Sequence, residues 1–369
     1  MKHTDQFFDA LTKRALEEGL LRAALIRVER EGVLLFEESW GYAYWSEDEK
    51  TPLSSDHQFD LASLSKLFTS TAILKLISSG EIEEGTRVVD LLWFRDSTLR
   101  AALKEVRIAN LLDHSSGLPP WFPFYTRLNE SFESILADIL VKQGLKKETL
   151  YSDINYMLLG SVIERLSGKN LREAMRDLVF EPLGLRRATY DPEAARTVAT
   201  EFGNRIEKRM LAERGLSFDR WRRDDVLIRG ECNDGNCHYY FKGAAGHAGI
   251  FADAADVARL CRVYLDDGQS ASGDYLDLDL LKVAVCNRGA DRGYGFQLGA
   301  NYPGGGFGHT GFTGTYLHIN PAADMTITVL SNRLHLSQAR NIDEYRRAVS
   351  KHALALFSKK NSNTERRSF

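Results

Sequence analysis

The sequence contains little cysteine and no long hydrophobic run. Its 4 cysteines in 369 residues are too few for a disulfide scaffold, so we expect free thiols. Cys232, Cys237 and His238 lie close together, but their spacing matches no zinc pattern and no second pair of ligands follows. No run of about 18 apolar residues occurs, so no membrane-spanning helix is expected. These absences disfavour a disulfide-stapled, a zinc-dependent and a membrane-spanning protein.

An excess of charge of one sign is also lacking. Lys and Arg number 48 against 51 Asp and Glu, which gives a formal net charge of -3. That balance disfavours nucleic acid or an anionic membrane as the main partner. Residues 7–18 read as an amphipathic helix, without the apolar segment and small-residue cleavage site of a secretory signal. We therefore expect a cytoplasmic protein that acts on a small molecule.

Strand-like patterns lie at both ends of the chain, in residues 23–30, 33–41, 308–311, 315–320 and 325–331. A further glycine-rich strand signal occurs at residues 243–251. Short turns join several of the consecutive strands, which predicts an antiparallel sheet because parallel strands need long crossovers. The strands from the two ends of the chain are expected to pair with each other.

The residues between these strands are mostly helical in pattern, with loops between the helices. Residues 155–166 form one such helix, closed by Ser167-Gly168, and residues 342–357 form a closing helix. We predict an α+β protein in which residues 1–78 and 243–369 build a sheet domain flanked by helices. Residues 79–242 would be an inserted, mostly helical domain, and a cleft would run between the two parts.

Ser63-Leu64-Ser65-Lys66 is the first candidate for catalytic chemistry. On a helix, Ser63 and Lys66 share a face, which makes them a plausible nucleophile and base. The residues that follow are apolar or small on nearly every side, as in a helix buried all round. Burial would lower the pKa of the lysine and free its lone pair for proton abstraction. A solvated Ser-x-x-Lys on a surface helix would match the same four letters.

Two further segments contain residues suited to such a site. Tyr151-Ser152-Asp153 precedes a predicted helix, and beside a lysine ammonium a tyrosine phenolate is favoured and can act as a base. His309-Thr310-Gly311 lies in a glycine-rich strand, where a substrate can approach the backbone and free N–H groups can bind an oxyanion. Each segment alone also fits a packing role. We interpret His114 and His247, both in turns, as structural.

Taken in this order, Ser-x-x-Lys, Tyr-x-Asp and His-Thr-Gly resemble the serine β-lactamase and penicillin-binding protein superfamily. The resemblance is closest to the branch that contains class C β-lactamases and esterases. Residues 111–119, 151–160 and 246–258 also look like segments typical of that branch, so the resemblance covers nearly the whole chain. It implies a β-lactamase/transpeptidase-like fold and a serine hydrolase.

The resemblance also implies a role for each residue of the three motifs. Ser63 would be the nucleophile, and Lys66 and Tyr151 would share the general base and acid work. The backbone N–H groups of Ser63 and Phe312 would form the oxyanion hole. A covalent acyl-enzyme would form and be released by water, without metal or organic cofactor. The substrate would be bound by Asp153, His309, Thr310 and Gly311.

Two positions depart from the family's usual pattern. Asp153 stands where the family usually has Asn, and if ionised it would hold Lys66 as an ammonium and favour Tyr151 as the base. His309 stands where Lys is common, and a histidine is largely neutral at pH 7. We therefore expect an esterase or amidase with at most weak β-lactam hydrolysis. A true β-lactamase, a D-alanyl-D-alanine carboxypeptidase and a non-catalytic binding member of the fold are the alternatives.

Overall fold

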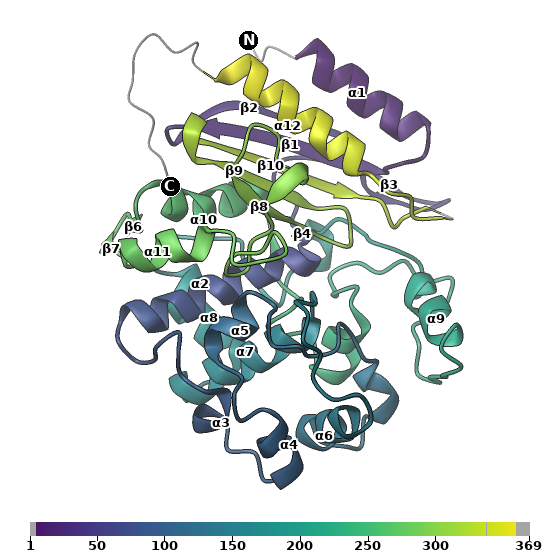
Figure 1. Ribbon diagram of the computed structural model, residues 1–369. Helices are drawn as coiled ribbons and strands as arrows, with labels where there is room; N and C mark the ends of the chain where they lie inside the picture. The colour runs from purple at the N-terminus through teal and green to yellow at the C-terminus, as the bar shows by residue number, and fades with distance from the viewer. Residues whose placement is uncertain (1–4, 337, 359–369) are drawn as a thin grey trace.

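A six-stranded antiparallel sheet forms one half of the protein (Figure 1), and its strands come from both ends of the chain. The computed structural model describes residues 5–336 and 338–358. The central strands pair the two ends, because Ala23 lies opposite Asn332 and Arg30 opposite Met325. The predicted antiparallel pairing is confirmed. The order is β3 (Lys50–Pro52), β2 (Val33–Trp45), β1 (Ala23–Arg30), β10 (Met325–Asn332), β9 (Tyr316–Asn320) and β8 (Phe307–Thr310).

Two helices from opposite ends of the sequence cover the outer face of this sheet. Figure 1 shows α1 (Gln6–Glu17) beside α12 (Asp343–Phe357), and the two helices contact each other. The hydroxyls of Thr12 and Tyr345 are joined by a buried hydrogen bond of 3.0 Å. Apolar side chains of the helices and strands form one cluster beneath them, which includes Phe8, Ile26, Val329 and Val349.

The inner face of the sheet packs on helices from the middle of the sequence. Helix α10 (Ala254–Leu265) contacts β1 and β10, and α2 (Ser65–Ser78) lies below the sheet beside α7 (Asp153–Ser167). Helix α2 is buried at nearly every position, as its apolar pattern predicts. The other α-helices of the described residues are α3 (Val88–Leu91), α4 (Ser97–Ala102), α5 (Ile108–Leu112), α6 (Phe132–Gln143), α8 (Leu171–Met175), α9 (Arg205–Ala212) and α11 (Leu278–Val285).

Three details differ from the sequence-based expectation. Ser63 lies in a 3₁₀ turn, Ala62–Leu64, and not in the α-helix that follows it. Helix α7 begins at Asp153, two residues before its predicted start. The glycine-rich segment 243–251 is mostly loop, and only its last residue enters a strand, β5 (Phe251–Ala252), paired with β4 (Phe59–Asp60). The described residues also contain a short hairpin of β6 (Gln269–Ser270) and β7 (Gly273–Asp274).

The loop at Gly246 shows why that segment is not a strand. A β-carbon at Gly246 would lie 2.1 Å from the carbonyl oxygen of Tyr156, so only glycine permits this approach to α7. The same loop accepts a hydrogen bond from Thr69 of α2 at the Gly246 carbonyl, 2.7 Å away. It therefore joins α2 to α7. No helix within residues 5–336 and 338–358 is long and apolar enough to cross a membrane.

Candidate active site

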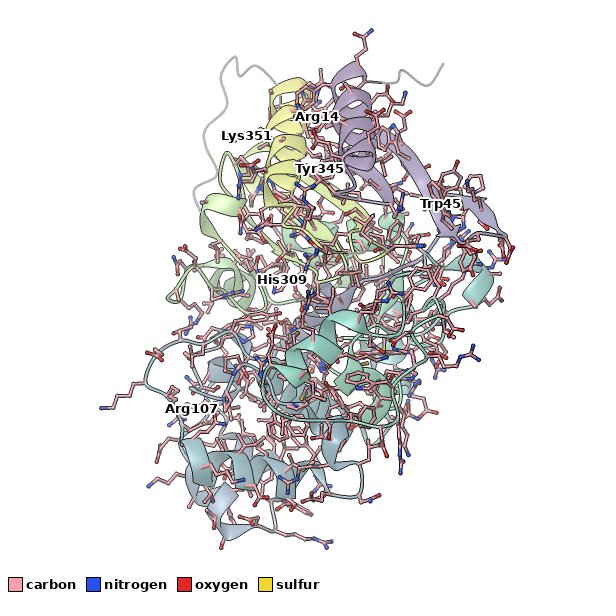
Figure 2. The ribbon with its side chains drawn as sticks, turned by 90° about the vertical axis from the view of Figure 1, so that its right-hand side faces the viewer. Arg14, Trp45, Arg107, His309, Tyr345 and Lys351 are labelled. Carbon is pink, nitrogen blue, oxygen red and sulfur yellow. The ribbon has the colours of Figure 1, made fainter. Side chains whose placement is uncertain are left out.

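A cavity of about 380 Å³ lies where the sheet edge meets the helices. Figure 2 places His309 in the middle of the molecule at this junction. Lys66 and Asp153 are not part of the cavity wall. Lys66 contacts Ser63, and Asp153 contacts Lys66. The structure thus brings all the predicted site residues to one place. The predicted residues that line the cavity are Ser63, Tyr151, His309, Thr310, Gly311 and Phe312.

Hydrogen bonds to Asp60 hold the turn that presents Ser63. Ala62, just before it, has a φ of 47°, a left-handed conformation that is costly for a residue with a β-carbon. The buried Asp60 carboxylate accepts the Ala62 N–H at 2.9 Å and the Asn233 N–H at 2.7 Å. Burial, only partly offset by these two hydrogen bonds, raises the pKa of Asp60 to about 6. The surrounding structure therefore fixes an otherwise unfavourable turn.

Lys66 is fully buried and uses all three of its N–H donors. Its Nζ lies 3.0 Å from Ser63 Oγ, 2.8 Å from Asp153 Oδ1 and 3.3 Å from the His247 carbonyl oxygen. Burial alone would lower the pKa of Lys66, but the nearby Asp153 and Tyr151 outweigh it and leave that pKa raised. The expectation of a lowered lysine pKa is therefore wrong, because Asp153 supplies a counter-charge. Lys66 is an ammonium that donates to the serine oxygen.

Two cations and two imidazoles surround Tyr151. Lys66 Nζ is 4.9 Å from the centre of its ring, and Arg292 Cζ is 4.8 Å from it. The ring of His114 lies 4.6 Å away and the ring of His309 5.8 Å away, centre to centre. Tyr151 stands just before α7, in the cavity wall with Ser63. Two positively charged side chains therefore contact the face of a tyrosine that lines the cavity with Ser63.

His114 and His247 each position a neighbouring segment. The buried His114 ring accepts the Ser152 N–H at Nδ1, 3.0 Å away, so its proton is on Nε2 and it fixes the backbone next to Tyr151. Burial, with Arg292 and Lys66 nearby, holds the pKa of His114 well below 6.5. His247 is bound to Asp234 Oδ1 at 3.0 Å while its carbonyl accepts from Lys66. Both contacts agree with the structural roles expected from the sequence.

His309 is a neutral side chain in the cavity wall. Burial is the main cause that holds its pKa well below 6.5, and Arg292 and Lys66 add to the effect. Its Nδ1–H donates to the Thr310 carbonyl at 2.7 Å, so Nε2 is left with a lone pair. The expectation of an uncharged histidine at neutral pH is confirmed. A fixed cation, as a lysine would supply, is lacking at this position.

The turn after β8 brings Phe312 next to Ser63. Thr313 and Thr315 donate to the carbonyls of Asp60 and Leu61, at 2.8 and 3.0 Å. A β-carbon at Gly311 would lie 1.9 Å from Thr315 Oγ1, so only glycine fits here. Within the described residues, neither the Ser63 nor the Phe312 backbone N–H has an acceptor. Both donors are therefore available to an oxygen in the cavity.

Three arginines at the site were missed by the sequence analysis. Arg346 of α12 is 6% exposed and donates to the carbonyls of Gly311 and Thr315, at 3.0 and 2.9 Å. Arg333 donates to the Phe312 carbonyl at 2.8 Å, and both arginines line the cavity with Asp343. Arg292 contacts Tyr151 from outside the cavity wall. Their sequence context gave no signal, since arginines in loops and on an amphipathic helix usually face solvent.

The sheet, the helices on both of its faces and the Ser63, Tyr151 and His309 constellation define the β-lactamase/transpeptidase-like fold. The chain belongs to the Beta-lactamase family, whose model matches residues 8–351. The resemblance seen in the motifs is therefore confirmed, and so is the predicted fold class.

Relatives of known name cover most of the chain. An N-acetylmuramyl-L-alanine amidase of Bacillus subtilis (strain 168) is 28% identical over 357 residues, which cover 89% of this chain and 80% of that protein. A class C β-lactamase from Rhodobacter sphaeroides matches with a TM-score of 0.70 at 19% identity, over 95% of this chain and all of that one. EstCE1, a hydrolase with promiscuous acyltransferase activity, matches with a TM-score of 0.71 at 19% identity. The match covers 93% of this chain and 97% of EstCE1.

Proposed function

We propose that the protein is a serine hydrolase that acts through a Ser63 acyl-enzyme on ester or amide substrates. The observation that carries this proposal is the position of Ser63 Oγ, which lines the cavity and lies 3.0 Å from the buried Lys66 Nζ. Two free backbone N–H groups beside it suit the oxyanion of an acyl-transfer reaction. Membership of the Beta-lactamase family supports the same reaction class.

In the proposed mechanism, Tyr151 is the base and Lys66 remains protonated. The Tyr151 phenolate takes the Ser63 proton while Oγ attacks the carbonyl carbon, and the N–H groups of Ser63 and Phe312 bind the resulting oxyanion. Tyr151 then gives that proton to the departing alcohol or amine, which leaves the acyl group on Ser63. Water attacks the acyl-enzyme with Tyr151 again as the base, and the proton returns to Oγ.

The neutral His309 favours substrates without a free carboxylate. A fixed ammonium at this position would bind a carboxylate, whereas an uncharged imidazole offers only a lone pair at Nε2. Asp153 places a further negative charge near Lys66 and repels anions. We therefore propose esters or simple amides as substrates, with at most weak hydrolysis of β-lactams.

A second candidate is supported by the arginines of the cavity. Arg333, Arg346 and one carboxylate, Asp343, line the cavity. Asp343 pairs with Arg346, so these three side chains leave one positive charge in excess. Such a wall suits a substrate carboxylate. A true β-lactamase or a D-alanyl-D-alanine carboxypeptidase is therefore the alternative, and the relative named as an amidase also fits peptide-like substrates.

Turnover of three substrates separates these candidates. We expect p-nitrophenyl butyrate to be hydrolysed faster than a chromogenic cephalosporin or a fluorescent penicillin, both of which carry a carboxylate. Faster turnover of the β-lactams, lost in Arg333→Gln while the ester rate is kept, would support the second candidate. A non-catalytic binding member of the fold would hydrolyse none of them and would acquire no covalent acyl group.

A further inference from the structure

Arg292 occupies an unusual place behind the tyrosine of the site. It lies in the segment between α11 and β8, and its Cζ is 4.8 Å from the centre of the Tyr151 ring. The segment is held by backbone hydrogen bonds, among them Arg292 N–H to the Gly289 carbonyl at 3.1 Å. Nη1 of Arg292 is buried and has no hydrogen-bond partner among the described residues. Arg292 does not line the cavity, so its contact with the site is Tyr151 itself.

The other groups around Tyr151 are either neutral or paired. From α2, Lys66 faces the ring but is matched by Asp153 of α7 at 2.8 Å. From the turn after α5 and from β8, His114 and His309 face it as neutral imidazoles. Across the cavity, Arg346 of α12 is paired with Asp343 at 2.9 Å, and Arg333 lies over the ring of Phe312 and not over that of Tyr151. In the described part of the chain Arg292 has no carboxylate within 4.0 Å, which makes it the uncompensated cation at this ring.

We infer that Arg292 is a positioning residue that stabilises the negative charge of Tyr151 while Tyr151 takes the proton of Ser63. This inference rests on the proposed function. A cation over an aromatic face is attracted more strongly to a phenolate than to a phenol, and partial burial strengthens the attraction. Arg292 itself gains and loses no proton, because a guanidinium stays charged. It would supply, from behind the ring, the fixed positive charge that the neutral His309 does not.

The pH dependence of ester hydrolysis tests this inference. We would measure kcat/KM for p-nitrophenyl acetate, an uncharged ester, between about pH 5 and 10, with Ser63→Ala as the background. Arg292→Gln should lose about tenfold in kcat/KM near neutral pH, and the acid limb should move up by about one pH unit. Its rate should approach that of the wild type at the alkaline end. Arg292→Lys, which keeps the charge, should recover part of the loss.

Arg288 provides a matched control in the same segment. Its Cζ lies 4.7 Å from the ring of Tyr294, and its Nε lies 3.3 Å from Asp113 Oδ2, so it is also an arginine over a tyrosine. Because neither Arg288 nor Tyr294 lines the cavity, Arg288→Gln should leave the acid limb in place even where it lowers the melting temperature. If the acid limb of the kcat/KM profile moves as far in Arg288→Gln as in Arg292→Gln, the inference is overturned.

The remaining outcomes separate the inference from the proposed function. A loss in Arg292→Gln that is equal at every pH would mean that Arg292 only supports the fold, and the inference would fail. A loss confined to carboxylate-bearing substrates would assign Arg292 to substrate binding, which also overturns it. Suppose that the wild type hydrolyses the ester and Tyr151→Phe removes the acid limb, while Arg292→Gln leaves the acid limb and kcat/KM unchanged. In that case the inference about Arg292 fails and the proposed function stands. A wild type without turnover or acyl adduct contradicts the proposed function itself.

Discussion

Lys66 Nζ and Asp153 Oδ1 lie 2.8 Å apart directly behind the candidate nucleophile. The lysine side chain is 0% exposed and the aspartate side chain 18% exposed, so the two charges meet in a largely dry environment. The carboxylate keeps the lysine as an ammonium, and an ammonium can donate to Ser63 Oγ but cannot take its proton. This one contact therefore moves the role of base from Lys66 to Tyr151 in the proposed mechanism.

Asp153→Asn should weaken the fold in a pH-dependent way. The replacement leaves the buried ammonium without its counter-charge, which should cost about 3 kcal/mol at neutral pH, the low end for a broken buried ion pair. The pKa of Lys66 is raised above its ordinary 10.5, so the stabilisation is fully present below that value and is lost as pH rises through the folded-state pKa. Denaturant unfolding at about pH 8 and about pH 11 measures this. If the wild type exceeds Asp153→Asn in free energy of unfolding by as much at about pH 11 as at about pH 8, Lys66 is not the ammonium that Asp153 stabilises.

Tyr151→Phe and Lys66→Met should each lower kcat for the ester by at least about 10²-fold, the low end for positioned acid–base groups. The first removes the proposed base, and the second removes the ammonium that holds Ser63 Oγ. Tyr156→Phe is a matched control, because its buried hydroxyl donates to the Leu112 carbonyl at 3.0 Å and Tyr156 does not line the cavity. It should lower stability and keep kcat. Full activity in Tyr151→Phe would refute the role of that tyrosine.

Ala62→Gly and Ala62→Val should differ sharply in stability and in ester turnover. Because Ala62 has a φ of 47°, glycine should be tolerated and gain about 1 kcal/mol of stability, whereas a β-branched residue should be strongly destabilised. The valine variant should also lose ester turnover, since the next residue is Ser63. Thermal unfolding and initial rates measure both effects. Equal behaviour of the two variants would show that this turn does not constrain Ser63.

His309 should contribute no inflection to the pH profile of kcat/KM near pH 6.5. Burial and the nearby cations hold its pKa well below that value, so it stays neutral over the whole working range. His309→Asn should therefore change the height of the profile but not its acid midpoint. An acid limb that disappears in His309→Asn would instead mean that the histidine titrates during the reaction.

Local patterns in the sequence were sufficient to predict the strands that the two ends of the chain contribute to the centre of the sheet. The predicted strand at residues 23–30 is found with the same bounds, because its alternating branched residues fill one strand of the sheet. Ser63, Tyr151 and His309 were singled out because their three motifs, in this order, resemble those of the serine β-lactamase and penicillin-binding protein superfamily. The limits of the proposed helical insertion, residues 79–242, stay a prediction.

The missed features depend on contacts between distant parts of the chain. Arg292 and Arg346 are ordinary arginines in the sequence, and only the packing of the loop before β8 and of α12 brings them to the site. The raised pKa of Lys66 was expected only on the condition that Asp153 is ionised and close, and the structure supplies that contact between residues 87 positions apart in the chain. Sequence spacing contains no information on such distances.

The most direct test of the central claim is the intact mass of the protein during turnover of p-nitrophenyl butyrate, followed by peptide mapping. We predict one butyryl group per chain, on the peptide that contains Ser63, removed as the substrate is exhausted and absent in Ser63→Ala. A butyryl group on another residue, or ester turnover that persists in Ser63→Ala, would contradict the account.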